Sequence, residues 1–247
     1  MTSSTERPLT AGYEEFARYA YPPNELGYCG PTDTDALLRG GSADELVSHA
    51  KEFDGAWPYL GAIADAAGIT DPLALEVVRN YWVGGPLLEA VDPDALLSRL
   101  RNSFTGQVTG ILDDLRPGEA LAHHSFHVFV VYPWIRFLER DPIKPVQVMQ
   151  DCRIRWGTVE SVREDHAVIN SQPLTFADGM LVLGDPASEQ VRWRKGDTSL
   201  APPPVPGQTV SAHWDWVCGP LRDGEADALA TATRASLDIV NTARSRA

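Results

Sequence analysis

The hydrophobic pattern of this chain changes once, near residue 142, and that change limits the possible folds more than any other feature. Up to about residue 140 the apolar residues recur mostly at helical spacing. Beyond Asp141-Pro-Ile-Lys-Pro145 they alternate with polar residues in short segments, such as 154–162 and 167–171. Glycine and aspartate residues separate these segments, which is typical of turns between strands. The segment 141–145 is therefore the predicted linker between a helical part and a strand-bearing part.

Several helix signals precede this linker. Ser42-Ala-Asp-Glu45 is a capping box, in which the serine oxygen and the glutamate carboxylate each bind a free backbone amide at a helix start. Asp92, followed by a proline, predicts a second helix start. The segment 119–138 is the most apolar of the set. It predicts a central helix, which Pro133 should kink.

Beyond the linker the pattern predicts short strands, the first at 146–149 and the last at 208–216. A final helix should run from a cap at Asp223 to about residue 243. Short, evenly spaced strands are typical of small barrels that close their own edges. We therefore predict an α+β protein, with an all-helical domain at 1–142 and a small β-barrel plus a C-terminal helix at 146–247.

Composition and charge exclude several classes of protein. The chain has 247 residues, of which 43% are hydrophobic and 22% charged, as in ordinary globular proteins. No run approaches the roughly 18–20 apolar residues that span a bilayer. The N-terminus also lacks the basic-then-apolar pattern of a secretory signal, so we expect a cytoplasmic protein without a membrane partner. The net charge of −13 argues against a nucleic-acid partner, because phosphate binding needs clustered Lys and Arg.

Two short segments hold the most informative pair of residues, Cys152 and His213. The first begins Cys152-Arg-Ile-Arg-Trp-Gly157 and continues as a predicted strand, turn and strand. The second reads Pro206-Gly-Gln-Thr-Val-Ser-Ala-His213 and leads toward the C-terminal helix. A thiolate and an imidazole on neighbouring strands of a small barrel would make a two-point site for a transition metal.

These segments resemble the HypC/HupF family of nickel–iron hydrogenase maturation chaperones, over about residues 150–245. The cysteine, glycine and histidine of that family correspond to Cys152, Gly157 and His213. The resemblance implies an OB-like HypC barrel and a carrier of iron with carbonyl and cyanide ligands, anchored by the thiolate. It also implies a maturation protein or the hydrogenase large subunit as partner. The family cysteine lies at the processed N-terminus, whereas Cys152 is internal, so no free α-amine lies beside this thiol.

The histidine-rich segment His123-His-Ser-Phe-His127 is a second candidate metal site. On a helix, His123 and His127 would face the same way, and Glu119 would extend the stripe by one turn. The same cluster includes His124. Imidazole and carboxylate donors suit iron or zinc, and haem is an alternative cofactor. These histidines could instead line a contact between helices.

Two further residues could support a metal at Cys152 and His213. Asp215 shares a predicted strand face with His213 and could orient its imidazole, or it could be a solvated acid. Cys29 lies in the turn-rich segment 21–33 and could be a third soft ligand, although a packed thiol is the simpler interpretation. The chain lacks the glycine-rich phosphate loops and Cys-x-x-Cys pairs of nucleotide and disulfide chemistry.

Two functions from different classes follow from these patterns. The first is an accessory protein for metallocentre assembly, which binds or carries an iron fragment through Cys152 and His213. The second is an iron- or haem-dependent enzyme, with His123 and His127 holding the metal and the barrel serving as an appendage. A scaffold without metal is a third, weaker alternative.

Overall fold

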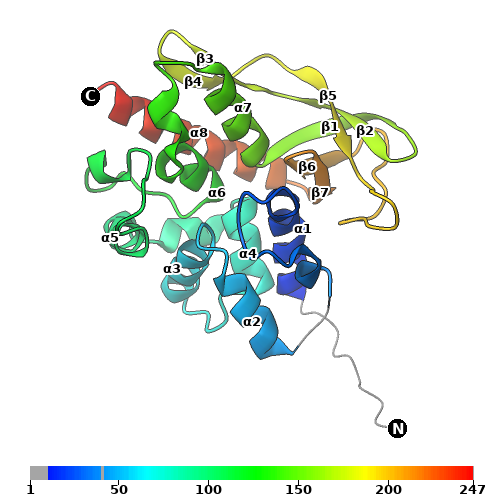
Figure 1. The fold of residues 1–247 in the computed structure, drawn as a ribbon, viewed down its shortest axis with the longest axis horizontal. Coiled ribbons are helices and arrows are strands. Elements are labelled where there is room, and N and C mark those ends of the chain that lie inside the picture. The colour runs from blue at the N-terminus through cyan, green and yellow to red at the C-terminus, as the bar shows by residue number, and fades with distance from the viewer. Residues whose placement is uncertain (1–10, 40–41, 247) are drawn as a thin grey trace.

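The computed structural model describes residues 11–39 and 42–246 and has the predicted α+β class (Figure 1). The helices of the first part of the chain form one layer, and the strands form a second layer together with the later helices (Figure 1). The first layer contains the helices α1 (Ala11–Glu25), η1 (Thr34–Leu37), α2 (Ala43–Lys51), α3 (Trp57–Ala67), α4 (Leu75–Trp82), η2 (Pro86–Ala90), α5 (Pro93–Ser103) and η3 (Leu112–Asp114).

The predicted start signals of two helices in this layer are confirmed. Ser42 accepts from the backbone amide of Glu45, and the Glu45 carboxylate accepts from the backbone amide of Ser42, so that both halves of the capping box are present at α2. Asp92 caps α5 by accepting from the backbone amides of Asp94 and Ala95. Such caps stabilise a helix by about 1 kcal/mol each, because the first amides of a helix have no intrahelical partner.

The predicted continuous helix at 119–138 is wrong. The structure has three short pieces in its place, namely α6 (His124–Phe126), the π-helix η4 (His127–Val131) and the 3-10 helix η5 (Pro133–Phe137). His123 has extended backbone angles and caps α6 instead of lying within it. Pro133 cannot donate a backbone hydrogen bond, so the helical pairing is interrupted where the two later pieces meet.

The predicted linker and first strand are also wrong, because residues 143–152 form the helix α7 (Ile143–Cys152). Pro145 is the third residue of α7, and in the first turn the missing amide of a proline costs no hydrogen bond. Val148 and Met149 are buried on one side of the helix. As a result, Cys152 lies at the end of a helix and not on a strand.

Five strands pair in a closed ring with the order β1-β2-β5-β7-β6, here called the strand ring. Its members are β1 (Arg155–Val162), β2 (His166–Ser171), β5 (Ala187–Arg192), β6 (Thr209–His213) and β7 (Trp216–Pro220). The pairing of β5 with β7 rests on the single pair Arg192 and Trp216, which makes it the narrowest seam. β3 (Leu174–Ala177) and β4 (Met180–Leu183) form a separate hairpin.

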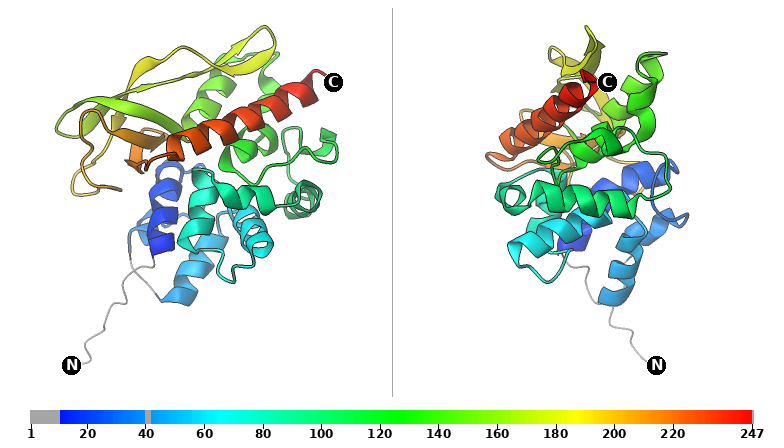
Figure 2. Two further views of the ribbon diagram at one scale, coloured as in Figure 1. Left: turned by 180° about the vertical axis from the view of Figure 1, so that it is seen from behind. Right: turned by 90° about the vertical axis from the view of Figure 1, so that its left-hand side faces the viewer.

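The last helix, α8 (Glu225–Arg244), matches the predicted C-terminal helix, although its N-cap is Gly224 and not Asp223. It crosses the back of the molecule and contacts α6, η4 and β4 (Figure 2). One hydrophobic core extends from Tyr13 to Ala243 and includes residues on both sides of position 142. Both parts of the chain thus contribute to the same core, and the predicted division into domains at 142 stays a prediction. No described helix is both long and apolar enough to cross a membrane.

Candidate metal centre

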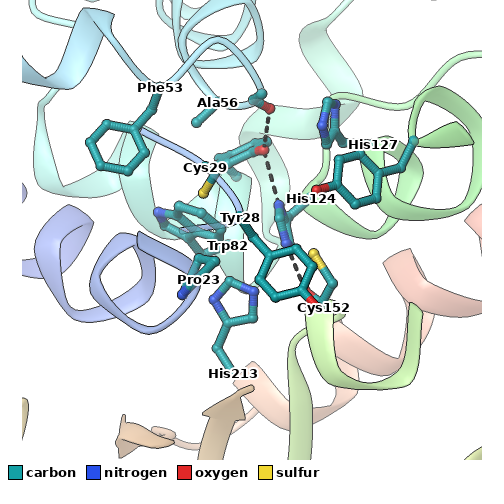
Figure 3. A pocket seen from close by; sticks show the side chains of 13 residues that line it. Pro23, Tyr28, Cys29, Phe53, Ala56, Trp82, His124, His127, Cys152 and His213 are labelled. Atoms are coloured by element: carbon teal, nitrogen blue, oxygen red, sulfur yellow. Dashed lines mark hydrogen bonds between the residues drawn. The ribbon is translucent and has the colours of Figure 1, made fainter. Parts of the chain in front are cut away.

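Three potential metal ligands converge between the two layers, each at one end of an element. His124 is the first residue of α6, Cys152 is the last residue of α7, and His213 is the last residue of β6. One ligand atom from each side chain lies within 4.8 Å of the other two. All three residues are buried, and their side chains surround one small space (Figure 3). The fold thus unites Cys152 and His213, the pair singled out in the sequence.

The ring of His213 is fixed in a form that suits metal binding. Its Nδ1 lies 2.6 Å from the carbonyl oxygen of Tyr19, and because a carbonyl can only accept, Nδ1 carries the proton. Nε2 therefore has a free lone pair, and it is buried without a hydrogen-bond partner in the described part of the chain. A hydrogen bond from one ring nitrogen to a carbonyl is the usual way in which a protein orients a metal-binding histidine.

The ring of His124 is held at both nitrogens. Nδ1 lies 3.1 Å from the Tyr81 hydroxyl, which also lies 2.8 Å from the carbonyl oxygen of Gly55. Nε2 lies 2.9 Å from the carbonyl oxygen of Cys152. If Nδ1 carries the proton, it donates to Tyr81, the hydroxyl donates onward to Gly55, and Nε2 has a lone pair for a metal. The other tautomer donates from Nε2 to the carbonyl oxygen of Cys152, which can only accept, so this form fits the metal-free site. A metal at Nε2 would replace this hydrogen bond and leave the proton on Nδ1.

Burial sets the charge of these three groups. It lowers the pKa of His124 to about 4 and the pKa of His213 well below its usual range, and His124 further lowers that of His213. Both imidazoles are therefore neutral at pH 7, which is the form that binds metals. Burial raises the pKa of the Cys152 thiol well above its usual range, and Cys29 and Asp151 raise it further. The thiol is protonated until a cation displaces the proton.

The turn between β6 and β7 directly follows the candidate ligand His213. His213 pairs with Trp216, so Trp214 and Asp215 make a two-residue turn. Trp214 has a φ angle of 52°, a left-handed conformation that is unfavourable for a bulky side chain. Its ring centroid lies 4.2 Å from that of Tyr28. The conformation is held in place because the backbone amide of Trp214 donates to the carbonyl of Asp151, at 2.7 Å.

Arg155 connects the elements that carry Cys152 and His213. Its buried guanidinium donates to the carbonyl oxygen of Trp214 in the turn and to that of Asp151 at the end of α7, the latter at 3.1 Å. It also forms an ion pair with Glu189 on β5, at 3.0 Å. One side chain therefore ties three elements together beside the three potential ligands.

The three ligands line an inner cavity with about 40 Å³ of space that the centre of a water molecule can occupy. About 10–15 Å³ of such space holds one water, so the cavity has room for an ion and a few small atoms. Its other walls are mainly aromatic or apolar and include Phe53, Trp82 and Tyr132. A donor set of two imidazoles and one thiol in a space of this size fits a transition metal ion.

The structure separates the other predicted site residues. His123 is not on a helical face with His127, because it caps α6 and its Nδ1 accepts from the backbone amide of Ser125 at 3.0 Å. Glu119 lies outside any helix and binds Arg246, at 2.6 and 2.7 Å. The predicted stripe of Glu119, His123 and His127 therefore does not exist.

Two of the remaining predicted residues line the inner cavity, and one does not. Cys29 and His127 are part of the cavity wall but lie outside the group of three converging ligands. Asp215 forms an ion pair with Arg192 and does not orient His213, because the turn at Trp214 interrupts the alternation of a strand. The carbonyl of Tyr19 has that role instead. No motif marks Tyr19, Tyr81 or Arg155 in the sequence, since each acts through a contact made only in the folded chain.

The fold and the site define a class of protein, an α+β protein with a buried candidate metal centre of two histidines and one cysteine. The chain belongs to DUF6390, described as a family of unknown function, which matches residues 8–247. No curated protein and no solved structure shows significant similarity to the chain. The resemblance to the HypC/HupF family stays a prediction.

Proposed function

We propose that this protein binds one first-row transition metal ion through His124, Cys152 and His213 and keeps one coordination position open to the inner cavity. The observation that carries this proposal is the convergence of the three ligand atoms within 4.8 Å of one another. Three protein ligands leave a four-coordinate ion with one free position, as in metal sites that bind an exchangeable group. The unpartnered Nε2 of His213 supports the same conclusion.

The donor set limits the choice of ion. Thiolate and imidazole suit zinc, iron, cobalt and copper, whereas magnesium and calcium prefer oxygen ligands. The resemblance of residues 150–245 to HypC/HupF proteins favours iron among these. It also favours a role in metallocentre assembly, in which the ion carries carbonyl or cyanide ligands toward a maturation protein or a hydrogenase large subunit. Few protein ligands suit such a carrier, because the ion has to leave again.

The alternative function is an iron-dependent enzyme. In that case the open position would bind the reactant, and the ligands would be His124, Cys152 and His213 instead of His123 and His127. The favouring observation is that the inner cavity extends away from the three ligands, toward Phe53 and His127. Haem is not part of this proposal, because about 40 Å³ of space is far too small for a porphyrin.

The test is anaerobic expression with added iron, followed by metal analysis and infrared spectroscopy. Wild type is compared with Cys152→Ala and His213→Gln, and with Cys218→Ala as a control, since Cys218 is buried outside the inner cavity. We expect about one metal ion per chain in wild type and control and none in the other two variants. Carbonyl and cyanide stretching bands would favour the carrier, and metal without them would favour the enzyme. A wild type without metal would refute both.

A further inference from the structure

A second cavity lies beside the inner one and is here called the outer cavity. It holds about 310 Å³ of space for the centre of a water molecule and includes exposed residues such as Glu52 and Gln107 in its wall. The two cavities share five lining residues, which are Tyr28, Cys29, Gly55, His127 and Tyr132. These five residues, which line both cavities, are here called the partition. A small shift in this partition would connect the candidate metal centre with the surface.

The partition contains two side chains that can bind a transition metal, Cys29 and His127 (Figure 3). Neither is part of the group of three converging ligands. The ring centroids of His127 and His124 are 6.4 Å apart, so an ion held by the first imidazole would be one step from the second. A soft thiol and an imidazole beside a passage are suited to hold such an ion briefly.

The imidazole of His127 has one long hydrogen bond and packs against a glycine. Its Nδ1 lies 3.4 Å from the Tyr59 hydroxyl, at the long end of the range for a hydrogen bond. Its Nε2 faces Gly55, where a Cβ atom would lie only 2.8 Å away. The absence of a side chain at position 55 therefore leaves the space that the imidazole uses. η4, which begins at His127, is a π-helix, and such segments occur frequently at functional sites.

The charge of the outer cavity favours a cation. Glu52 and Asp54 line it, and neither forms an ion pair with another described residue. No Lys or Arg is among the described residues of its wall. Carboxylates at the mouth of a cleft raise the local concentration of cations and the rate at which they associate. The chain as a whole adds to this field with its net charge of −13.

We infer that the outer cavity is the path by which a divalent transition metal ion reaches the centre, and that Cys29 and His127 bind the ion transiently at the partition. This inference rests on the proposed function, since it assigns a route to that metal. It gives the two residues a role in transfer and none in the final coordination. Glu52 and Asp54 act earlier, by attracting the hydrated ion to the outer cavity.

The experiment measures the kinetics of Co²⁺ binding to the full-length, metal-free protein, with the thiolate-to-cobalt absorption as signal. The variants are Cys29→Ser and His127→Gln, and the controls are Cys218→Ala and His166→Asn, which lie outside both cavities. Release is measured in a second mixing step with an excess of chelator. Circular dichroism shows whether each variant is folded before its rates are compared.

A residue that only assists passage changes the association and dissociation rates by the same factor, because the path is used in both directions. We therefore expect both rates to fall together in Cys29→Ser and His127→Gln while Kd stays unchanged. The double variant Glu52→Gln/Asp54→Asn should associate about tenfold more slowly at low salt, with the difference lost at high salt. Glu164→Gln, an exposed acid outside the outer cavity, is its control.

The outcomes separate the two proposals. A wild type that gives no cobalt signal at equilibrium would refute the proposed function itself. Normal binding with unchanged rates in Cys29→Ser and His127→Gln would leave that function intact and overturn the route. A weaker Kd with an unchanged association rate would also overturn it, because the residue would then be a ligand of the final site.

Discussion

The Nδ1 of His213 lies 2.6 Å from the carbonyl oxygen of Tyr19, which joins the last residue of β6 to α1 across 194 positions of sequence. This hydrogen bond fixes the tautomer and the direction of the imidazole before any metal binds. It also comes from a backbone atom, so no substitution of Tyr19 removes the acceptor itself. The candidate site is thus oriented by the way the two layers pack.

The group that orients His124 is the hydroxyl of the Tyr81 side chain, which a substitution can remove. Tyr81→Phe deletes the hydroxyl beside Nδ1 and keeps the ring, so the imidazole loses its orienting partner. We expect metal affinity to fall by about 10–100-fold, the usual effect of losing such a partner. Competition titration with a coloured chelator measures this. Tyr59→Phe, which removes the hydroxyl beside His127, is the matched control and should leave Kd unchanged.

Metal affinity should depend on pH through Cys152. Burial raises the pKa of this thiol well above its usual range, with smaller contributions from Cys29 and Asp151, so the metal-free thiol is protonated at neutral pH. Binding a metal then releases one proton, and Kd should improve about tenfold per pH unit between pH 6 and 8. Calorimetry in two buffers of different ionisation enthalpy counts the proton. A value near zero would show that Cys152 does not bind as a thiolate.

The stability of the metal-free protein should fall in acid because of the four buried histidines, His123, His124, His127 and His213. Burial lowers the pKa of His123 and His127 to about 3 and that of His124 to about 4, and it also lowers that of His213. The unfolded chain therefore binds protons near pH 6.5 that the folded chain binds only at lower pH. This stabilisation is present above pH 6.5 and is lost as the pH falls toward 4.

Each such histidine contributes a slope of about 1.4 kcal/mol per pH unit between its two pKa values. Urea unfolding at pH 7, 6 and 5 measures the total. A free energy of unfolding that is constant from pH 7 to 5 would contradict the prediction.

Arg155 should be important for stability as well as for the position of the site. Arg155→Met leaves the carbonyl group of Trp214 without its donor and removes the ion-pair partner of Glu189. The carbonyl of Asp151 loses one of its donors and keeps the backbone amide of Trp214. We expect a loss of about 3 kcal/mol in the free energy of unfolding, typical of breaking a buried pair. The exposed pair of Arg99 and Asp65 provides the comparison, and Arg99→Met should cost less than about 1 kcal/mol.

The positive φ angle of Trp214 can be tested by two replacements at one position. Both Trp214→Ala and Trp214→Gly lose the indole, but glycine adopts the left-handed conformation without strain. We expect the glycine variant to be more stable than the alanine variant by about 1 kcal/mol. At Trp216, on β7, the order should reverse, because glycine weakens a strand. Denaturant unfolding of the alanine and glycine variants at both positions measures these differences in the free energy of unfolding.

The sequence predicted local features well and long-range geometry poorly. Caps such as Ser42 and Asp92 act within one turn, so their motifs are sufficient to locate them. The continuous helix expected at 119–138 does not form, because His123 adopts extended backbone angles and Pro133 interrupts the backbone hydrogen bonds of a helix. Val146 to Met149 alternate as a strand would, yet they lie in α7, where Val148 and Met149 are buried and Gln147 is exposed. Four residues are too few to distinguish the two periods.

The candidate site shows the same contrast. Cys152 and His213 stood out through their motifs, and His124 belonged to a conspicuous histidine cluster. Which histidine of that cluster would face Cys152 depended on the end of α7 and the start of α6, and these were mispredicted. The contacts of Tyr19, Tyr81 and Arg155 with the site follow from the packing of the layers, to which no short motif corresponds.

The three proposed ligands lie at element ends and are separated by 28 and 61 positions, and the acceptor for His213 comes from α1. During synthesis the first imidazole and the thiol leave the ribosome well before the second imidazole. A nascent chain that stops short of position 213 has no complete centre, however much of its helical layer has formed. Metal occupancy would thus report that translation has passed this point and that α1 has docked against β6. An ion bound there would in turn oppose the separation of the layers, by an amount that grows with its free concentration.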